Sequence, residues 1–492
     1  MSPLPAPLCV KSLMRDYIHR SLYGSLSGSV PYFSREVIVG GAGGFNFQGM
    51  IGRSEYEHVL SQLYRSSERG WMTPVEIFTP WYSYAIAAYL LKGSRETGNV
   101  KVYEVGGGTG RHAINVLDYL KEANPSLYAR GGISYTILEI SAQLHARQSA
   151  ALLAAGHKPS IARSVCMDAL RVHETIRDDS PCTVTALEVL DNLPHDKVVC
   201  LVDESGRESL METWVEDYGE EDGRRETYTP LVDPVVREMW GMMEEAAGGG
   251  GTGGGGGGKG GGGVWREWLG GVCRRLPPLP TALQDKSCPQ RHRPPPTPAG
   301  FKWAMLAPTG QLMLLQALRA ALPNHRLLAA DYSSLPLPSV LPETSLSDVG
   351  VHCYAPPDAL PGCGGPPWGS PALRGLMRRP FGRVLSYGLL NPLHSPLLVA
   401  SKCPETRMTR DHGTYLSPPL GSADIFFPTD FPLLAYMASR VGGGGGAVAR
   451  QPPIIIESSE FLKAHGRVER TCTLSGFNPM LDTFKNTKFM IT

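Results

Sequence analysis

Short apolar runs alternate with helical stretches between residues 100 and 200 of this chain. The runs VKVYEV, ISYTILEI and TVTALEVL are rich in β-branched and other apolar residues, which predicts buried strands. Strands that alternate with helices are typical of a parallel, Rossmann-like α/β sheet with helices on both faces. We therefore predict that this segment is the organised core of the protein.

Similar patterns flank this core on both sides. Residues 12–35 and 54–70 predict N-terminal helices. The segment FTPWYSYAIAAYLL predicts a largely buried helix, with Thr79 as its N-cap and Pro80 as its first residue. Farther along, GQLMLLQALRAALPNHRLLAADY predicts a helix, a turn and a buried strand, so the α/β core resumes after residue 300.

The pattern breaks where glycine and proline accumulate. Residues 248–263 are nearly pure glycine, and residues 276–300 are proline-rich and basic. Neither segment can bury enough apolar surface to offset the entropy of ordering, which predicts a mostly disordered insertion. The predicted organisation is an N-terminal helical extension (1–98), a ligand-binding α/β core (99–243), the insertion (244–300) and the remainder of the core with substrate-side elements (301–492).

Composition removes several classes of function. The chain has 47 Lys and Arg against 46 Asp and Glu, so its net charge of +1 gives no overall field for nucleic acid. We find no apolar run of the length that a transmembrane helix needs. The ten cysteines and thirteen histidines show no metal-binding spacing. The expected partners therefore include no nucleic acid and no metal, and no membrane span is expected.

The strongest chemical signal is a glycine loop between a predicted strand and a predicted helix. In KVYEVGGGTGRHAINVLDYL, Glu104 ends the strand, and Gly106, Gly108 and Gly110 let the backbone turn tightly and approach a ligand closely. Arg111 stands where a dinucleotide fingerprint requires glycine, and a carboxylate would repel a pyrophosphate. The Glu-x-Gly-x-Gly-x-Gly pattern resembles motif I of class I S-adenosylmethionine-dependent methyltransferases, which implies that cofactor; a plain tight turn is the alternative.

Two further acids are candidates for the same cofactor site. Glu139 ends the next predicted strand, where its carboxylate can accept both hydroxyls of a ribose. Asp168 stands where such methyltransferases often have an acid or amide near the adenine. The alternatives are a solvated capping acid for Glu139 and an ordinary helix N-cap for Asp168.

Glu188 and Asp191 follow the third predicted strand, in TALEVLDNLP. Both can face the crevice above the sheet, where ligands of open α/β folds bind. Paired carboxylates suit a cationic acceptor, above all a guanidinium, whose planar fork matches carboxylates in bidentate contacts. We therefore predict that these two residues orient the methyl acceptor; strand-end capping and loop solvation are the alternative.

A narrower resemblance rests on several segments taken in order. FTPWYSYAIAAYLL, EVGGGTG, ALEVLDNLP, LLAADYSSLP and GSADIFFPTDF are similar to landmarks of the MidA-like family of mitochondrial complex I assembly methyltransferases. The resemblance implies a class I methyltransferase fold and methylation of an arginine in a complex I subunit, in mitochondria. It also implies that Glu104 to Gly110 and Glu139 form the cofactor site and that Glu188 and Asp191 are acceptor-side acids.

Some positions differ from that family. Leu187, Asn192 and Ser333 stand where the family usually has asparagine, alanine and glycine. The differences at Leu187 and Ser333 favour an alternative, a non-catalytic assembly or scaffold protein that retains the methyltransferase fold. Near the C-terminus, Asp424 and Asp430 either line the acceptor groove or belong to a turn before a helix.

Overall fold

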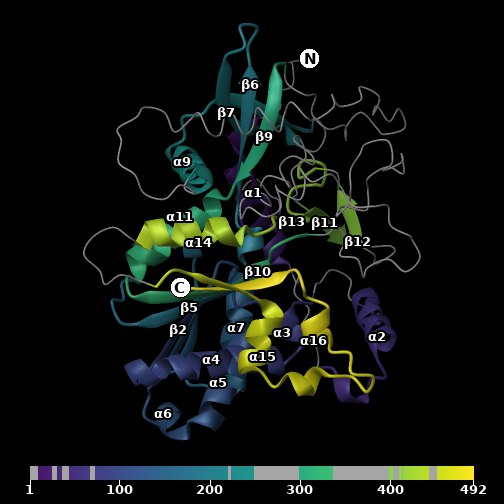
Figure 1. Ribbon diagram of the computed structural model, residues 1–492, viewed down its shortest axis with the longest axis vertical. Coiled ribbons are helices and arrows are strands. Elements are labelled where there is room, and N and C mark those ends of the chain that lie inside the picture. The colour runs from purple at the N-terminus through teal and green to yellow at the C-terminus, as the bar shows by residue number, and fades with distance from the viewer. Residues whose placement is uncertain are drawn as a thin grey trace, which may run out of the picture.

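A computed structural model describes most of the chain outside its glycine- and proline-rich segments (Figure 1). The described residues are 9–24, 30–35, 44–66, 72–219, 223–248, 299–335, 398–402, 409–412, 414–442 and 451–492. Residues 249–298, most of the predicted insertion, lie outside this part, and their disorder stays a prediction.

A seven-stranded sheet lies at the centre of the described residues. The strands from β10 to β4 are parallel, whereas β15 is antiparallel to both of its neighbours. In spatial order the sheet contains β14 (Ile454–Glu457), β15 (Thr487–Ile491), β10 (His325–Tyr332), β5 (Cys182–Leu187), β2 (Val100–Val105), β3 (Ile133–Glu139) and β4 (Ala162–Cys166). The predicted α/β fold class and the predicted strands of the core are confirmed.

Helices cover both faces of this sheet, as Figure 1 shows. Because side chains alternate along a strand, Tyr103 and Val105 pack into one core while Val100 and Val102 pack into the other. On the first face lie α9 (Pro234–Gly248), α11 (Thr309–Ala321) and α14 (Phe431–Gly442). On the second face lie α4 (Trp81–Thr97), α5 (Arg111–Ala123) and α15 (Ser458–His465).

The chain order of the strands determines where a ligand can bind. From β2 the chain adds β3 and then β4 on one side, and it later adds β5 and β10 on the other side. Ligands of open α/β sheets bind where the loops after two such strands diverge, so we expect the ligand crevice at the carboxyl ends of β2 and β5. The glycine loop follows β2, and Glu188 follows β5, so both candidate sites lie at this crevice.

Between β5 and β10 the chain builds four strands of an antiparallel sheet, and the fifth strand, β1 (Val10–Leu13), comes from the N-terminal segment. The path of this sheet is β1, β7 (Glu208–Asp217), β6 (Asp196–Val202) and β9 (Phe301–Ala307), and β8 (Arg224–Pro230) pairs with β7. Residues 196–230 thus build this sheet rather than the central sheet, although they fall inside the segment 99–243 that we took as one core. A smaller sheet contains β12 (Thr409–His412), β11 (Leu398–Lys402) and β13 (Asp424–Phe426).

Some predicted elements differ at their ends. The helix expected over residues 12–35 is only α1 (Met14–Leu22), because residues 10–13 pair with β7 as an edge strand instead. The second expected helix is α2 (Arg53–Ser66), which ends before residue 70. Helix α4 begins at Trp81 with Pro80 as its N-cap, so the predicted capping role of Thr79 is wrong. The Thr79 hydroxyl instead accepts a hydrogen bond of 2.9 Å from Asn115 Nδ2.

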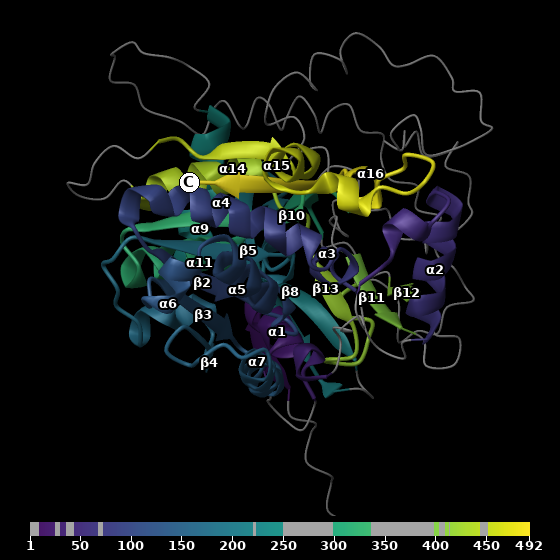
Figure 2. The ribbon, with the colours of Figure 1, turned by 90° about the horizontal axis from the view of Figure 1, so that it is seen from below.

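Most of the remaining α-helices are only four or five residues long. They include α3 (Pro74–Ile77), α6 (Pro125–Ala129), α7 (Ala142–Ala154) and α16 (Pro479–Asp482) (Figure 2). None of the helices in the described ranges is both long and apolar enough to cross a membrane.

Candidate functional site: a glycine loop and a cluster of buried acids

The glycine loop between β2 and α5 has a backbone that few other residues could adopt. Gly106, Gly108 and Gly110 have φ angles of 69°, 52° and 84°, in the left-handed region. A Cβ atom on Gly106 would lie 2.9 Å from Val189 Cγ2, and one on Gly107 would lie 2.5 Å from Ile137 Cγ2. The loop is therefore packed against the ends of the neighbouring strands, and its glycines keep the backbone accessible on the crevice side.

Glu139 is tied to this loop through a residue that the sequence analysis missed. Its Oε1 accepts a hydrogen bond of 2.9 Å from Ser141 N, and its Oε2 accepts one of 2.8 Å from Gln148 Nε2. Gln148, fully buried on α7, also donates to the Gly108 carbonyl at 2.9 Å. The only signal in the sequence was a polar residue on an otherwise apolar helix face. Burial raises the pKa of Glu139, while these hydrogen bonds oppose the rise.

The Glu104 side chain is buried beneath the glycine loop and is not at the protein surface. The side chain is 3% exposed, and its Oε2 accepts a hydrogen bond of 3.0 Å from the Tyr135 hydroxyl. Burial raises the pKa of Glu104 to about 8, and the nearby charge of Glu139 adds to the rise. The structure therefore brings these two predicted cofactor acids close together at the ends of adjacent strands.

Asp168 acts as a helix cap in the structure, as its alternative interpretation held. Its Oδ1 accepts a hydrogen bond of 2.9 Å from Leu170 N at the start of the 3-10 helix Ala169–Glu174. Its other oxygen, Oδ2, lies 3.2 Å from Nε2 of His19 on α1. Because the cap uses Oδ1, Oδ2 is the oxygen that faces α1. The predicted role of Asp168 near the adenine stays a prediction.

Glu188 and Asp191 are held by an aspartate from the neighbouring strand. Asp331, fully buried at the end of β10, accepts hydrogen bonds from Leu190 N at 2.8 Å and from Asp191 N at 3.0 Å. Glu188 has a φ of 52°, which is rare for a residue other than glycine. The Tyr332 hydroxyl lies 3.4 Å from Glu188 Oε1. The backbone turn that presents both acids therefore depends on β10.

Asp424 joins the same cluster from the far end of the chain. Asn192 Nδ2 donates to Asp424 Oδ1 at 2.8 Å, and the amide of Phe427 donates to the Asp191 carbonyl at 2.7 Å. Asp424 thus lies beside Asp191. Its predicted role in an acceptor groove stays a prediction. Asp430 instead accepts a hydrogen bond of 3.0 Å from Leu433 N at the start of α14.

The predicted acceptor-side cluster consists of Glu188, Asp191, Asp331 and Asp424. Burial and mutual repulsion raise the pKa values of Glu188 to about 8 and of Asp191 well above its ordinary value. Burial raises the pKa values of Asp331 and Asp424 to about 7. Within the described residues no Lys or Arg pairs with the cluster, and Asp191 Oδ1, in a residue only 2% exposed, has no hydrogen-bond partner. An entering cation would therefore lower the electrostatic cost of these carboxylates.

The raised pKa values of two glutamates predict a pH dependence of stability. The pKa values of Glu104 and Glu188 are raised to about 8, so the folded chain holds protons that the unfolded chain has released. The free energy of unfolding should therefore fall as the pH rises from about 6.5 to 8, by up to about 1.4 kcal/mol per pH unit for each group. Below pH 6.5 the lowered pKa values of the buried His112 and His195 oppose this trend. Urea denaturation across this range would measure the slope.

Two variants test whether Glu104 contributes to the slope of the free energy of unfolding against pH. Glu104→Gln removes one titrating group and should make the slope shallower. Glu174→Gln removes an exposed carboxyl whose pKa is lowered, so it should leave the slope unchanged. A wild-type free energy of unfolding that stays constant or rises over this range would contradict the prediction.

The fold and the glycine loop together define a class I methyltransferase. The chain belongs to a family of S-adenosyl-L-methionine-dependent methyltransferases, which matches residues 85–362, more than half of its length. The predicted methyltransferase class and the predicted cofactor, S-adenosylmethionine, are thereby confirmed. Comparison with curated proteins finds no match.

Several solved structures are similar to this chain. A Burkholderia thailandensis protein bound to S-adenosyl-homocysteine matches with a TM-score of 0.50 and 14% identity, covering 98% of this chain and 87% of that one. An uncharacterized protein from the same organism matches with a TM-score of 0.47 and 13% identity over the same shares of the two chains. The CcbJ methyltransferase from Streptomyces caelestis has a TM-score of 0.31 and 10% identity, covering 86% of this chain and 92% of that one.

The residues at the crevice fit S-adenosylmethionine. The glycine loop packs so that added Cβ atoms on Gly106 and Gly107 would meet Val189 and Ile137, which keeps the loop in one shape beside the crevice. Glu139 offers a carboxylate suited to ribose hydroxyls, and the acids of the crevice suit an amino group and a sulfonium better than a pyrophosphate. When bound, this cofactor supplies an electrophilic methyl group.

Proposed function

We propose that the protein transfers a methyl group from S-adenosylmethionine to an arginine of another protein, a subunit of mitochondrial complex I, and so supports assembly of that complex. The observation that carries the arginine acceptor is the cluster of three buried aspartates and the half-buried Glu188, without a Lys or Arg partner among the described residues. The complex I subunit and the mitochondrial location rest on the family resemblance of the sequence motifs.

A guanidinium suits this cluster for two physical reasons. Its charge persists at all physiological pH values, so it can lower the raised pKa values of Glu188 and Asp191 by direct attraction. Its planar fork can meet two carboxylates at once, which a lysine ammonium cannot do with the same directionality. Held in this way, one nitrogen of the acceptor is oriented toward the cofactor side of the crevice, and this positioning contributes to the rate enhancement.

Each acid of the cluster has a distinct task in this proposal. Glu188 and Asp191 hold and orient the guanidinium, and Glu188 is close enough to the Tyr332 hydroxyl (3.4 Å) for the two to orient each other. Asp331 keeps the turn in place through its two backbone hydrogen bonds. Asp424, fixed by Asn192, adds negative charge beside Asp191 and closes that side of the cluster.

The non-catalytic alternative draws on positions that differ from the MidA-like family, and two of these positions have structural partners. Asn192 fixes Asp424, and the Ser333 hydroxyl donates to the Asn486 carbonyl at 2.8 Å. These contacts are compatible with an intact site. They therefore supply no observation that favours a scaffold function over an enzyme.

Mass spectrometry of complex I tests the proposed function. In cells that lack this protein, one arginine of a complex I subunit should lose its methylation, and the wild-type chain should restore it. A variant with both Glu188→Gln and Asp191→Asn should reach mitochondria, as a fluorescent fusion would show, without restoring the modification. Unchanged arginine methylation in cells that lack the protein would contradict the proposal.

A further inference from the structure

Helix α1 lies between the antiparallel sheet and the central sheet, although the sequence places it in an N-terminal extension (Figure 1). Its apolar side packs with residues of β7 and β13 in a third core that includes Met14, Ile18 and Ile425. Its polar side chains meet partners at both ends. The helix therefore connects two regions that are far apart in the sequence.

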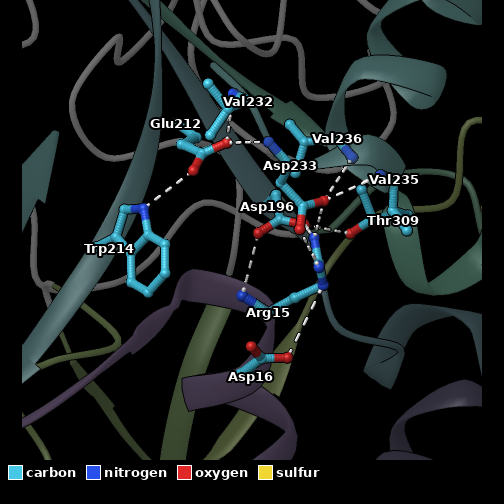
Figure 3. Close-up of polar contacts among 10 residues, drawn as sticks. All are labelled: Arg15, Asp16, Asp196, Glu212, Trp214, Val232, Asp233, Val235, Val236 and Thr309. Atoms are coloured by element: carbon cyan, nitrogen blue, oxygen red, sulfur yellow. Dashed lines mark hydrogen bonds and ion pairs between the residues drawn. The ribbon is translucent and has the colours of Figure 1, made fainter. Parts of the chain in front are cut away.

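At its N-terminal end, α1 is held by Arg15 (Figure 3). Arg15 Nη1 donates to Asp196 Oδ2 and to Asp233 Oδ1, both at 2.9 Å, and Nη2 donates to Asp233 Oδ2 at 2.7 Å. Asp196 begins β6 and also accepts a hydrogen bond of 2.8 Å from Thr309, while Asp233 caps α9. Since the Arg15 side chain is only 13% exposed, this bidentate pairing fixes α1 to the inserted sheet.

Toward its C-terminal end, α1 meets residues of the functional site. His19 Nε2 lies 3.2 Å from Oδ2 of Asp168, a predicted cofactor residue. The hydroxyl of Tyr23 donates to the carbonyl of Asn192 at 3.2 Å, and the side chain of Asn192 holds Asp424. One short segment therefore contacts both the cofactor side and the acceptor side of the crevice.

The surroundings of Tyr23 support this placement. Its ring stacks on Phe33, with centroids 5.3 Å apart and planes 12° from parallel. Burial raises the pKa of Tyr23, and so do the charges of two acceptor-side acids, Asp424 and Asp191, and of two cofactor-side acids, Asp168 and Glu139. The phenol thus lies within electrostatic reach of both groups of acids. Among the acids and bases that face it, these four carboxylates dominate.

We propose that α1 is a wall of the S-adenosylmethionine site and that Tyr23 is a positioning residue, held in place over the crevice by the Arg15 contacts. Tyr23 joins the residues that flank the cofactor to those that hold the acceptor. Arg15 acts through the helix and has no contact with the site itself. This inference rests on the cofactor and not on the identity of the acceptor, so cofactor binding tests it separately from arginine methylation.

Calorimetric titration with S-adenosylhomocysteine tests the role of Tyr23. Tyr23→Phe removes only the hydroxyl and should weaken binding about tenfold, as expected for the loss of one hydrogen bond that orients a binding site. Tyr17→Phe is a matched control, because Tyr17 lies on the same helix but packs against Tyr415 in the third core, with ring centroids 5.8 Å apart. Its affinity should stay within about twofold of wild type.

Amide hydrogen exchange tests whether α1 is part of the cofactor site, and it does not depend on methyl transfer. Binding of S-adenosylhomocysteine should slow the exchange of amides 14–23 in the full chain. Arg15→Lys keeps the positive charge but cannot form the same fork with two carboxylates, so these amides should exchange faster and the affinity should fall. Arg15→Lys tests the helix even if Tyr23→Phe alters folding.

The outcomes separate this inference from the assigned cofactor. If Tyr23→Phe and Arg15→Lys bind S-adenosylhomocysteine as wild type does, and amides 14–23 exchange at the same rate with and without it, α1 is structural only and the inference is overturned. If the folded wild-type protein fails to bind S-adenosylhomocysteine, the inference falls together with the cofactor site. If the wild-type protein binds S-adenosylhomocysteine but methylates no arginine, the proposed acceptor is overturned and the inference about α1 is not affected.

Discussion

Glu188→Gln should slow methyl transfer to arginine by about 100-fold or more, because the acceptor loses a charged partner that orients it. The amide keeps the shape of the side chain and can still approach the Tyr332 hydroxyl, which lies 3.4 Å from Glu188 Oε1. Binding of S-adenosylhomocysteine should stay within about threefold of wild type, since the glycine loop and Glu139 are unchanged. Transfer of labelled methyl groups to dissociated complex I subunits would measure the first effect, and calorimetry the second.

Asp191→Asn is the matched partner of this variant. Asp191 Oδ1 has no hydrogen-bond partner, so its replacement removes a charge without breaking a contact of that atom. We expect a similar loss of turnover and, because the charge lies beside Asp331 and Asp424, a gain in stability at high pH. Full turnover in both variants would contradict the acceptor assignment, and loss of cofactor binding in both would contradict the division of tasks.

Gly106→Arg should lower the affinity for S-adenosylhomocysteine by at least about 100-fold. The residue has a φ of 69°, and even a Cβ atom would lie 2.9 Å from Val189 Cγ2. A long side chain must therefore displace Val189, in the loop after β5, or occupy the space beside the glycine loop, and either change removes the cofactor site. Calorimetric titration of folded protein would measure the loss.

Two further variants separate backbone strain from the loss of the site. Gly106→Ala adds only the Cβ atom and should weaken binding in the same direction, even if Gly106→Arg fails to fold. Gly156 has a φ of 81° with no atom within 4 Å of an added Cβ, so Gly156→Ala introduces similar strain away from the loop. Its cofactor affinity should match wild type. Equal losses in both alanine variants would show that strain alone, rather than the loop, explains the result.

The sequence alone determined the central features that depend on local pattern. The apolar strands at 100–105, 133–139 and 182–187 alternate with helical stretches, as is typical of a covered parallel sheet, so the α/β class and these strands followed from the pattern. The glycine loop was recognisable because its spacing is local and its backbone excludes most other residues. The methyltransferase class and the cofactor then followed from the loop, and both are confirmed.

Only the tertiary structure decided which distant residues share the site. Gln148 reaches the loop because α7 turns one polar side chain inward, and Asp331 and Asp424 join Asp191 from segments 140 and more positions away. Side chains separated by so many residues meet only through the packing of strands and loops, which periodicity along the chain does not specify. The same reason explains why the sequence did not place α1 at the site. Its pattern indicated a helix. The carboxylates that hold Arg15 and the carbonyl that accepts a hydrogen bond from Tyr23 come together only when the inserted sheet packs on the core.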